Sequence, residues 1–315
     1  MDLLTIGDIA IDLYMKISDR DALPEESGDG EPKICFFHGS KIPVEHFQTA
    51  VAGNSFNVAV GCQKLGLKTA IYAEIGDDEN GEKVEKELEK LGIETDLCIK
   101  TRGDNTNVNS VIIYGDDRTI FSYHAKRNYK IRKWKKPKWI YYTSMGDGFE
   151  EFQKELLQYI SKNNDMGVAF NPGTIQMKHG LSSFKDFLTI VDILFLNKEE
   201  ATALVGTADL AELHNKLGDL GPKMTVITDS KNGATCDDGT GMKYQPSYSD
   251  ERPVVDKTGA GDAFASGFIS AVFYGKPAEV ALKWGVVNAG SIIKEIGTTK
   301  GLRTKNEIED VIKKI

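Results

Sequence analysis

The sequence lacks the features that mark membrane-spanning, secreted and nucleic-acid-binding proteins. Its 315 residues contain no apolar run as long as a membrane span, which needs about 18 such residues. The N-terminus enters a strand-like segment directly, without a basic segment and an apolar signal core, so we expect a cytoplasmic protein. The net charge of −8 argues against a surface that binds nucleic acid or membranes.

Cysteine and histidine are scarce and widely spaced. The four cysteines form no C-x-x-C pair, and the five histidines show no metal-ligand spacing. We therefore expect free thiols in a reducing compartment and no structural transition-metal site. The cysteines are Cys35, Cys62, Cys98 and Cys236.

Several familiar site motifs are also missing. The segment from Gly61 to Gly66 approaches a P-loop, but Leu67 interrupts it and it lies at the end of a predicted helix. The dinucleotide fingerprint fails because Phe264 replaces its third glycine. Neither a G-x-S-x-G nucleophile elbow nor an H-E-x-x-H zinc motif occurs.

Short apolar runs alternate with helical patterns along most of the chain, which predicts a parallel sheet covered on both faces. The predicted strands are Leu3–Ile6, Thr69–Ala73, Trp139–Tyr142, Gly167–Phe170, Ile193–Leu196 and Thr225–Thr228. The predicted helices are Ser55–Leu65, Glu79–Leu91, Phe149–Ile160, Phe184–Thr189, Glu199–Val205, Leu210–Leu217, a helix around Phe264–Val272, Ala278–Ile293 and a closing helix around Ile308–Ile312.

Two segments break this alternation. Residues 11–49 contain an acidic stretch, 19–31, that we interpret as a loop between short strands. Asn107–Tyr123 predicts a β-hairpin with its turn at Gly115. We therefore predict a main α/β domain made of residues 1–10, 50–100 and 124–315. Residues 11–49 and 101–123 would form a small β lid beside it.

The stretch Val254–Phe264 reads as an extended entry, a glycine-containing turn and a helix start. Free N–H groups at such a helix N-terminus bind anions, and small residues allow a phosphate to approach. Asp262 is unexpected there, because a carboxylate repels phosphate. It is either a general base that takes a proton from an attacking hydroxyl, or the N-cap of a glycine-rich turn.

Small or polar residues follow each of the six predicted strands, at the edge where open parallel sheets bind ligands. Each one alone is ordinary turn or capping chemistry, but six together favour a shared site. They are Gly7-Asp8, Glu74 to Asp77, Thr143-Ser144, Asn171 to Thr174, Asn197 to Glu200 and Asp229 to Gly233.

The segment Ala52–Asn57 is a second candidate binding element. Gly53 permits close backbone approach, and Asn54 and Asn57 lie three residues apart on a first helical turn. Paired amides suit a polyhydroxyl ligand, because they both donate and accept hydrogen bonds. Asp12 adds an acceptor for two hydroxyls. An N-cap and a buried helix amide would explain the same residues.

These elements together resemble the PfkB, or ribokinase-like, family of carbohydrate kinases over essentially the whole chain. Asp256–Asp262 is similar to the family's D-T-x-G-A-G-D signature, and Ala52–Asn57 to its N-terminal glycine-rich signature. Asn197–Glu200 matches its N-x-x-E element, and Thr228–Gly233 resembles its nucleotide-binding strand end. The resemblance implies a three-layer α/β/α domain with a mostly parallel sheet and a small β lid.

The resemblance also implies an ATP-dependent kinase that phosphorylates a sugar hydroxyl, with Mg²⁺ and in some relatives K⁺ as cofactors. Asp262 would be the base, and the amides of Gly259, Ala260 and Gly261 the anion hole. Mg²⁺ would be held through water near Asn197 and Glu200, and K⁺ near Asp256. The implied substrate-binding residues are Asp12, Gly53, Asn54 and Asn57, and the implied nucleotide-binding residues are Asn197, Glu200, Thr228, Gly233, Thr258 and Asn288.

The chain departs from the family pattern at Lys257, where the signature has threonine, and at Asn54, where it has its second glycine. Ser230 replaces a glycine of the nucleotide strand end, and Asn171–Thr174 replaces the fructokinase-like D-x-N-x-R stretch. These departures leave the base in place and put the identity of the acceptor in question.

Three other readings stay open for the chain. A nucleoside kinase would need a slot for a base, which aromatic residues of the lid segments would supply: Phe36, Phe37, Phe121 and Tyr123. A phosphosugar kinase would need lid cations, for which Arg102, Arg118, Lys126 and Arg127 are available, although surface solvation also explains them. A regulator without turnover is disfavoured by the intact Gly259–Asp262 segment. An exposed β lid would suit a homodimer.

Overall fold

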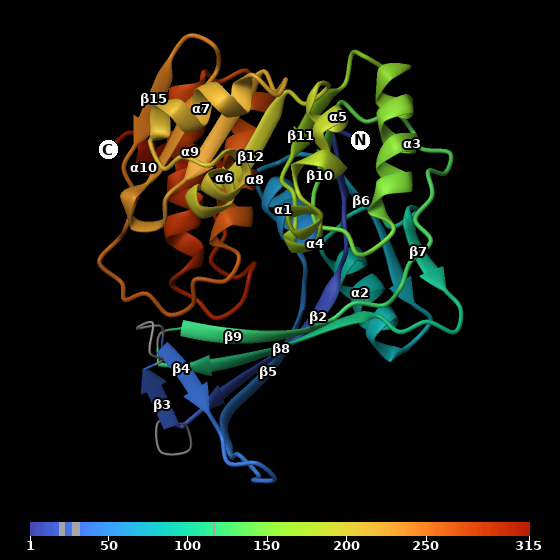
Figure 1. The fold of residues 1–315 in the computed structure, drawn as a ribbon, viewed down its shortest axis with the longest axis vertical. Helices are drawn as coiled ribbons and strands as arrows, with labels where there is room; N and C mark the ends of the chain where they lie inside the picture. The colour runs from blue at the N-terminus through green and yellow to red at the C-terminus, as the bar shows by residue number, and fades with distance from the viewer. Residues whose placement is uncertain (19–22, 27–31, 116) are drawn as a thin grey trace.

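A nine-stranded sheet runs through the centre of the protein (Figure 1). The computed structural model describes residues 1–18, 23–26, 32–115 and 117–315. The strand order is β15-β14-β13-β12-β11-β10-β1-β6-β7, and every pair from β13 to β7 is parallel. Only β14 and β15 add antiparallel edges. The strands are β1 (Leu3–Ile6), β6 (Thr69–Gly76), β7 (Cys98–Thr101), β10 (Trp139–Tyr142), β11 (Gly167–Phe170), β12 (Ile193–Asn197), β13 (Met224–Thr228), β14 (Ala234–Asp237) and β15 (Met242–Gln245).

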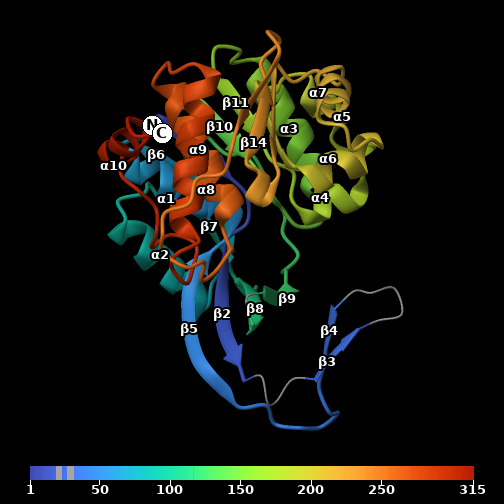
Figure 2. The ribbon, with the colours of Figure 1, turned by 90° about the vertical axis from the view of Figure 1, so that its left-hand side faces the viewer.

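Helices cover both faces of this sheet, and Figure 2 shows the three layers edge-on. One layer contains α1 (Asn54–Lys64), α2 (Glu79–Lys90), α8 (Ala260–Phe273), α9 (Ala278–Ile292) and α10 (Lys305–Ile312). The other contains α3 (Phe149–Ser161), α4 (Thr174–His179), α5 (Lys185–Leu188), α6 (Lys198–Val205) and α7 (Leu210–Gly218). The predicted doubly covered, mostly parallel sheet is confirmed.

Neighbouring strand residues enter different cores, because side chains alternate across a sheet. In β10, Tyr142 packs with Phe152 of α3 and Phe170, while Tyr141 lies in the cluster of Phe264 and Phe268 from α8. Both faces of the central strands are therefore apolar, which is why these strands read as continuous hydrophobic runs. The sheet is thereby fixed as a rigid base for the residues at its edge.

A second sheet of four strands lies away from the helices (Figures 1 and 2). Its order is β5-β2-β8-β9, and it is called the lid sheet below. A separate hairpin, β3-β4, projects from it. The bounds are β2 (Ala10–Ile17), β3 (Leu23–Glu26), β4 (Pro32–Cys35), β5 (Val44–Ala52), β8 (Asn107–Tyr114) and β9 (Asp117–Tyr123). The division of the chain into two domains stays a prediction.

Most predicted elements agree with the structure to within a few residues, and the β8-β9 hairpin is confirmed. The loop predicted for 19–31 is wrong at Leu23–Glu26, which pairs with β4. Its other residues, 19–22 and 27–31, lie outside the described part of the chain. The long strand β5 and the edge strands β14 and β15 were not predicted, because their polar and apolar residues do not separate clearly by face.

The four cysteines are free thiols, as predicted. No helix within the described residues is both long and apolar enough to cross a membrane.

Candidate active site

A cavity of about 390 Å³ lies between the carboxyl edge of the central sheet and the lid sheet. Side chains from both sheets and from the first turns of α1, α6 and α8 meet there. Most residues predicted for substrate and phosphate binding line this cavity. They are Asp12, Gly53, Asn54, Asn57, Asn197, Glu200, Thr228, Thr258, Gly259, Ala260, Gly261 and Asp262.

The first turn of α8 forms one end of the cavity. Gly259 has φ 78°, in the left-handed region that favours glycine, and an added Cβ would meet Thr298 at 3.0 Å. The Ala260 N–H donates to the Lys257 carbonyl over 3.3 Å. The N–H groups of Gly259 and Gly261 have no acceptor among the described residues, so two of the three predicted anion-hole amides are free.

Asp262 is buried on the same turn and faces the cavity. Its only hydrogen-bond partner within the described chain is the Asn57 amide, whose Nδ2 donates to Oδ2 over 2.7 Å. Burial raises the pKa of Asp262 to about 7, and the Asn57 hydrogen bond opposes part of that rise. The carboxylate does not cap its own helix, so the N-cap interpretation is wrong.

Asp256 braces the loop that enters this turn. Its Oδ1 accepts from the Thr258 N–H at 2.8 Å and the Thr258 hydroxyl at 2.6 Å, and its Oδ2 accepts from the Gly297 N–H at 3.2 Å. The Ile293 carbonyl also accepts the Val255 N–H at 2.8 Å. The glycine-rich turn is therefore held against the segment that follows α9.

Asp12 forms the opposite side of the cavity. Its two oxygens accept from Asn109 Nδ2 at 2.9 Å and from the Tyr14 hydroxyl at 3.0 Å. Burial raises its pKa, although both hydrogen bonds act against the shift. Asn109, Arg118 and Ile120 share this face of the lid sheet, because their positions alternate in register with Asp12.

Gly53 joins β5 to α1 at a close backbone approach. Its φ is 117°, and an added Cβ would meet the Asp8 carbonyl at 2.5 Å. The glycine thus allows α1 to begin beside β1, with Asn54 at the cavity wall. Asn57, predicted as a substrate ligand, donates a hydrogen bond from Nδ2 to Asp262. Its buried Oδ1 has no partner in the described structure.

Asn197 and Glu200 form a capping box at the start of α6. Asn197 Oδ1 accepts the Glu200 N–H at 2.8 Å, and Glu200 Oε2 accepts the Asn197 N–H at 2.9 Å. Both residues also line the cavity, so their capping role is compatible with the predicted role in the site. Burial raises the pKa of Glu200. The described residues contain no cluster of three metal-ligating side chains, so an ion here would rely on phosphate and water oxygens.

Two predicted nucleotide-binding residues lie outside the cavity. Asn288 is fully buried between α8 and α9, where it donates to the Ala263 carbonyl at 2.9 Å and accepts from the Arg303 N–H at 3.0 Å. Gly233 has φ 89°, and an added Cβ would meet the Gln245 carbonyl at 2.2 Å. The structure gives both residues a role in packing.

The six polar strand ends divide into two groups. Asn171 at the end of β11 and Asn197 at the end of β12 line the cavity, whereas at the end of β13 only the last strand residue, Thr228, lines it and the predicted residues 229–233 do not. The ends of β1, β6 and β10 do not line it. There Asp8 accepts from the Tyr129 hydroxyl at 2.7 Å and lies 3.7 Å from His124. The cavity therefore brings together the predicted residues of two of the six ends, and the prediction of one site shared by all six is wrong for the other four.

Several cavity residues were not predicted. Asn109 and Thr298 lie on segments whose pattern signals only a hairpin and a turn, and Lys257 was noted only as a departure from the signature. Of the four candidate lid cations, Arg118 alone lines the cavity. The aromatic residues proposed for a base slot do not line it either.

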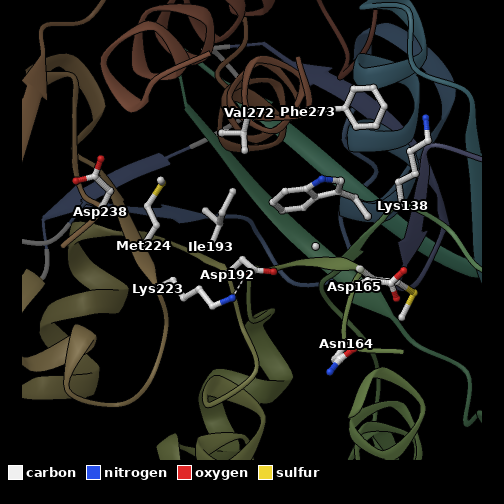
Figure 3. A pocket seen from close by; sticks show the side chains of 13 residues that line it. Lys138, Asn164, Asp165, Asp192, Ile193, Lys223, Met224, Asp238, Val272 and Phe273 are labelled. Carbon is white, nitrogen blue, oxygen red and sulfur yellow. Dashed lines mark hydrogen bonds and ion pairs between the residues drawn. The ribbon is translucent and has the colours of Figure 1, made fainter. Parts of the chain in front are cut away.

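A larger hollow of about 890 Å³ lies at the opposite, amino-terminal edge of the sheet (Figure 3). Its charged residues are paired with one another or with neighbours, as Figure 3 shows for Lys223 and Asp192, whose Nζ and Oδ1 are 2.7 Å apart. Ligands of open parallel sheets bind at the other edge. The larger volume therefore does not mark the active site.

The model of the pfkB family carbohydrate kinases matches residues 5–305. The ATP-dependent 6-phosphofructokinase of Thermoanaerobacterium thermosaccharolyticum is 24% identical over 94% of this chain and 89% of its own. The nucleoside kinase of Methanothermobacter thermautotrophicus is 24% identical over 97% and 94% of the two chains. The structure of Arabidopsis thaliana ribokinase complexed with ribose and ATP superposes with a TM-score of 0.80 at 20% identity, covering 99% of this chain and 98% of that one.

Proposed function

The chain belongs to the pfkB family of carbohydrate kinases, and on this premise we propose that it transfers the γ-phosphate of ATP to a sugar hydroxyl in the cavity beneath the lid sheet. One observation carries the proposal. Asp262, a buried carboxylate with a pKa of about 7, lies beside the free amides of α8 and in the same cavity as Asp12. A base, an anion site and a hydroxyl site therefore face one space.

Asp262 acts as the general base. It takes the proton of the acceptor hydroxyl as the acceptor oxygen bonds to the γ-phosphorus, and the bond from that phosphorus to the leaving oxygen of ADP breaks. A pKa near the operating pH suits this role, because much of the carboxylate is ionised and still basic. A positioned base contributes about 10²–10⁴ in rate.

The amides of Gly259 and Gly261 form the anion hole. They are unpartnered in the described structure and lie at the positive end of α8. The Ala260 amide joins them if its 3.3 Å bond to the Lys257 carbonyl opens. Asp256 contributes by bracing the loop rather than by touching the substrate.

Asn197, Glu200, Thr228 and Thr258 lie on the nucleotide side of the cavity. Mg²⁺ bound to the ATP phosphates neutralises charge on the transferring group. Glu200 would hold its hydration shell, since one of its carboxylate oxygens stays free of the capping box. Donation by ATP agrees with the cytoplasmic location predicted for the chain.

Potassium near Asp256 stays a prediction. The carboxylate already accepts three hydrogen bonds, out of about four that its lone pairs allow. An ion there would take most of its ligands from backbone carbonyls.

The acceptor side is polar, which favours a polyhydroxyl substrate. Asp12, fixed by Tyr14 and Asn109, is poised to accept from two hydroxyls, and Asn54 adds an amide. The aromatic residues named for the nucleoside alternative do not support it, because none of Phe36, Phe37, Phe121 and Tyr123 lines the cavity.

That outer face of the lid sheet is also the surface we propose for homodimer formation. Phe47 and Phe121 are 59% and 62% exposed on it. Register places them on the face opposite Asp12 and Asn109. Exposed apolar residues gathered on one sheet face favour burial against a second copy.

The test is ADP release by the purified protein with MgATP against a panel of sugars, phosphosugars and nucleosides. We expect one or more sugars to raise ADP release well above the rate with ATP alone. Stimulation by nucleosides only would replace the sugar assignment by the nucleoside one. No stimulation by any acceptor, with intact ATP binding, would favour a regulator without turnover.

A further inference from the structure

Lys257 occupies the signature position at which the family has threonine, and its backbone is fixed on both sides. Its carbonyl accepts the Ala260 N–H at 3.3 Å, and the adjoining Asp256 carboxylate binds both the N–H and the hydroxyl of Thr258. The Cα of Lys257 is thereby held one turn from the anion hole.

The Lys257 side chain is exposed and lines the cavity. Its ammonium has no hydrogen bond or ion pair with any of the described residues. By contrast, Lys198, which begins α6 beside the cavity residue Asn197, is paired with Asp229 at 3.1 Å. Lys257 can therefore meet an incoming anion without first breaking a protein contact.

The charges around the cavity favour a cation beside the bound phosphates. Three carboxylates line it, Asp12, Glu200 and Asp262, and burial raises the pKa of each because desolvation disfavours the ionised form. ATP and the phosphoryl group in transfer add several negative charges to the same space. Against them the free amides of α8 offer only partial positive charge, and Arg118 lines the cavity from β9 of the lid sheet.

We propose that Lys257 is a catalytic residue of this chain, whose ammonium contacts the transferring γ-phosphoryl group and stabilises its charge in the transition state. The inference rests on the proposed function. Lys257 takes no part in the proton transfer, since Asp262 receives the proton of the acceptor. Fixed cations aimed at a phosphoryl group act most strongly where charge moves during transfer.

The experiment compares wild-type protein with Lys257→Thr, which restores the residue of the family signature, and with Lys257→Arg, which keeps the charge. Lys276→Thr makes the same change at an exposed lysine beyond the other end of α8 and serves as the matched control. Each protein is assayed for kcat with its best acceptor. Calorimetry then gives the affinities for MgADP and for Mg²⁺ with AMPPNP, an ATP analogue that is not hydrolysed.

For Lys257→Thr we expect kcat to fall about 10- to 100-fold, the range of one charge-assisted hydrogen bond. AMPPNP affinity should fall while MgADP affinity stays within about two-fold, because only AMPPNP carries the γ-phosphoryl group. Lys257→Arg should retain most activity, and Lys276→Thr should match wild type.

Two results would overturn the assignment. Wild-type kcat in Lys257→Thr would show that the ammonium does not reach the phosphoryl group. Equal losses of ADP and AMPPNP affinity would make Lys257 a general nucleotide contact. Failure of the proposed function looks different: the wild-type protein would then bind AMPPNP without any acceptor-stimulated ADP release, and the ratio of the two affinities would still test the γ-phosphoryl contact.

Discussion

Replacing Asn57 by alanine should shift the pH dependence of catalysis. The Asn57 amide donates a hydrogen bond to Asp262 over 2.7 Å. This bond lowers the pKa of Asp262 and burial raises it, and with both effects the pKa is about 7. A hydrogen bond to a charged group contributes about 1.5–3 kcal/mol, and one pKa unit corresponds to about 1.4 kcal/mol. Loss of the amide should therefore raise the pKa of Asp262 by about one to two units.

The expected rate loss follows from the ionised fraction of the base. At about pH 7, a rise of one to two units reduces the ionised fraction by about five- to fifty-fold. At about pH 9 much of the loss should disappear, because the carboxylate ionises again. Thermal unfolding of the variant would check that the fold is retained.

The assay is kcat/KM for the acceptor between about pH 6 and about pH 9, which reports the base of the free enzyme. Asn54→Ala is the matched control, because Asn54 lines the cavity from the same helical turn without contacting Asp262. It should change the KM of the acceptor and leave the profile in place. An Asn57→Ala profile that coincides with that of wild type would refute the reasoning.

Three further outcomes are expected. Gly53→Ala should be strongly destabilised in thermal unfolding, because φ is 117° and its Cβ would meet the Asp8 carbonyl at 2.5 Å; Gly239→Ala, at φ 84° with open space around it, should lose much less. Asp262→Asn should become more stable than wild type as pH rises from about 4 to about 7. The raised pKa of the buried Asp262 means that the wild-type protein loses folding stability over that pH range, and the variant has no such carboxyl. Urea unfolding at several pH values should show a gain of about 1–4 kcal/mol at neutral pH that vanishes in acid; a constant difference would contradict the raised pKa. Phe47→Ser should shift the protein towards monomer in sedimentation experiments, whereas a wild-type monomer would exclude the proposed dimer.

Sequence reasoning predicted the central sheet because its strands are buried on both faces and read as uninterrupted apolar runs. It located the start of α8 because Phe264, Phe268 and Val272 recur at helical spacing after a glycine-containing turn. The lid was harder. In β5, Phe47 is exposed and the polar residues alternate weakly, so the strand has no clear buried face.

Contacts between segments far apart in the sequence could not be predicted. The Asn57–Asp262 bond joins residues 205 positions apart, and no local pattern reports it. Asn288 was expected in the nucleotide site only because of the family resemblance. Its amide donates to the Ala263 carbonyl and accepts from the Arg303 N–H. These partners come within reach only when the chain folds and α8 packs on α9.

The most direct test of the account is acceptor-stimulated ADP release by Asp262→Asn beside wild type, with AMPPNP affinity measured on both. If Asp262 is the base, the variant should bind AMPPNP about as well as wild type and lose about 10²–10⁴ in kcat. Wild-type turnover in Asp262→Asn would contradict the central claim, because no proton acceptor would then be required at the first turn of α8.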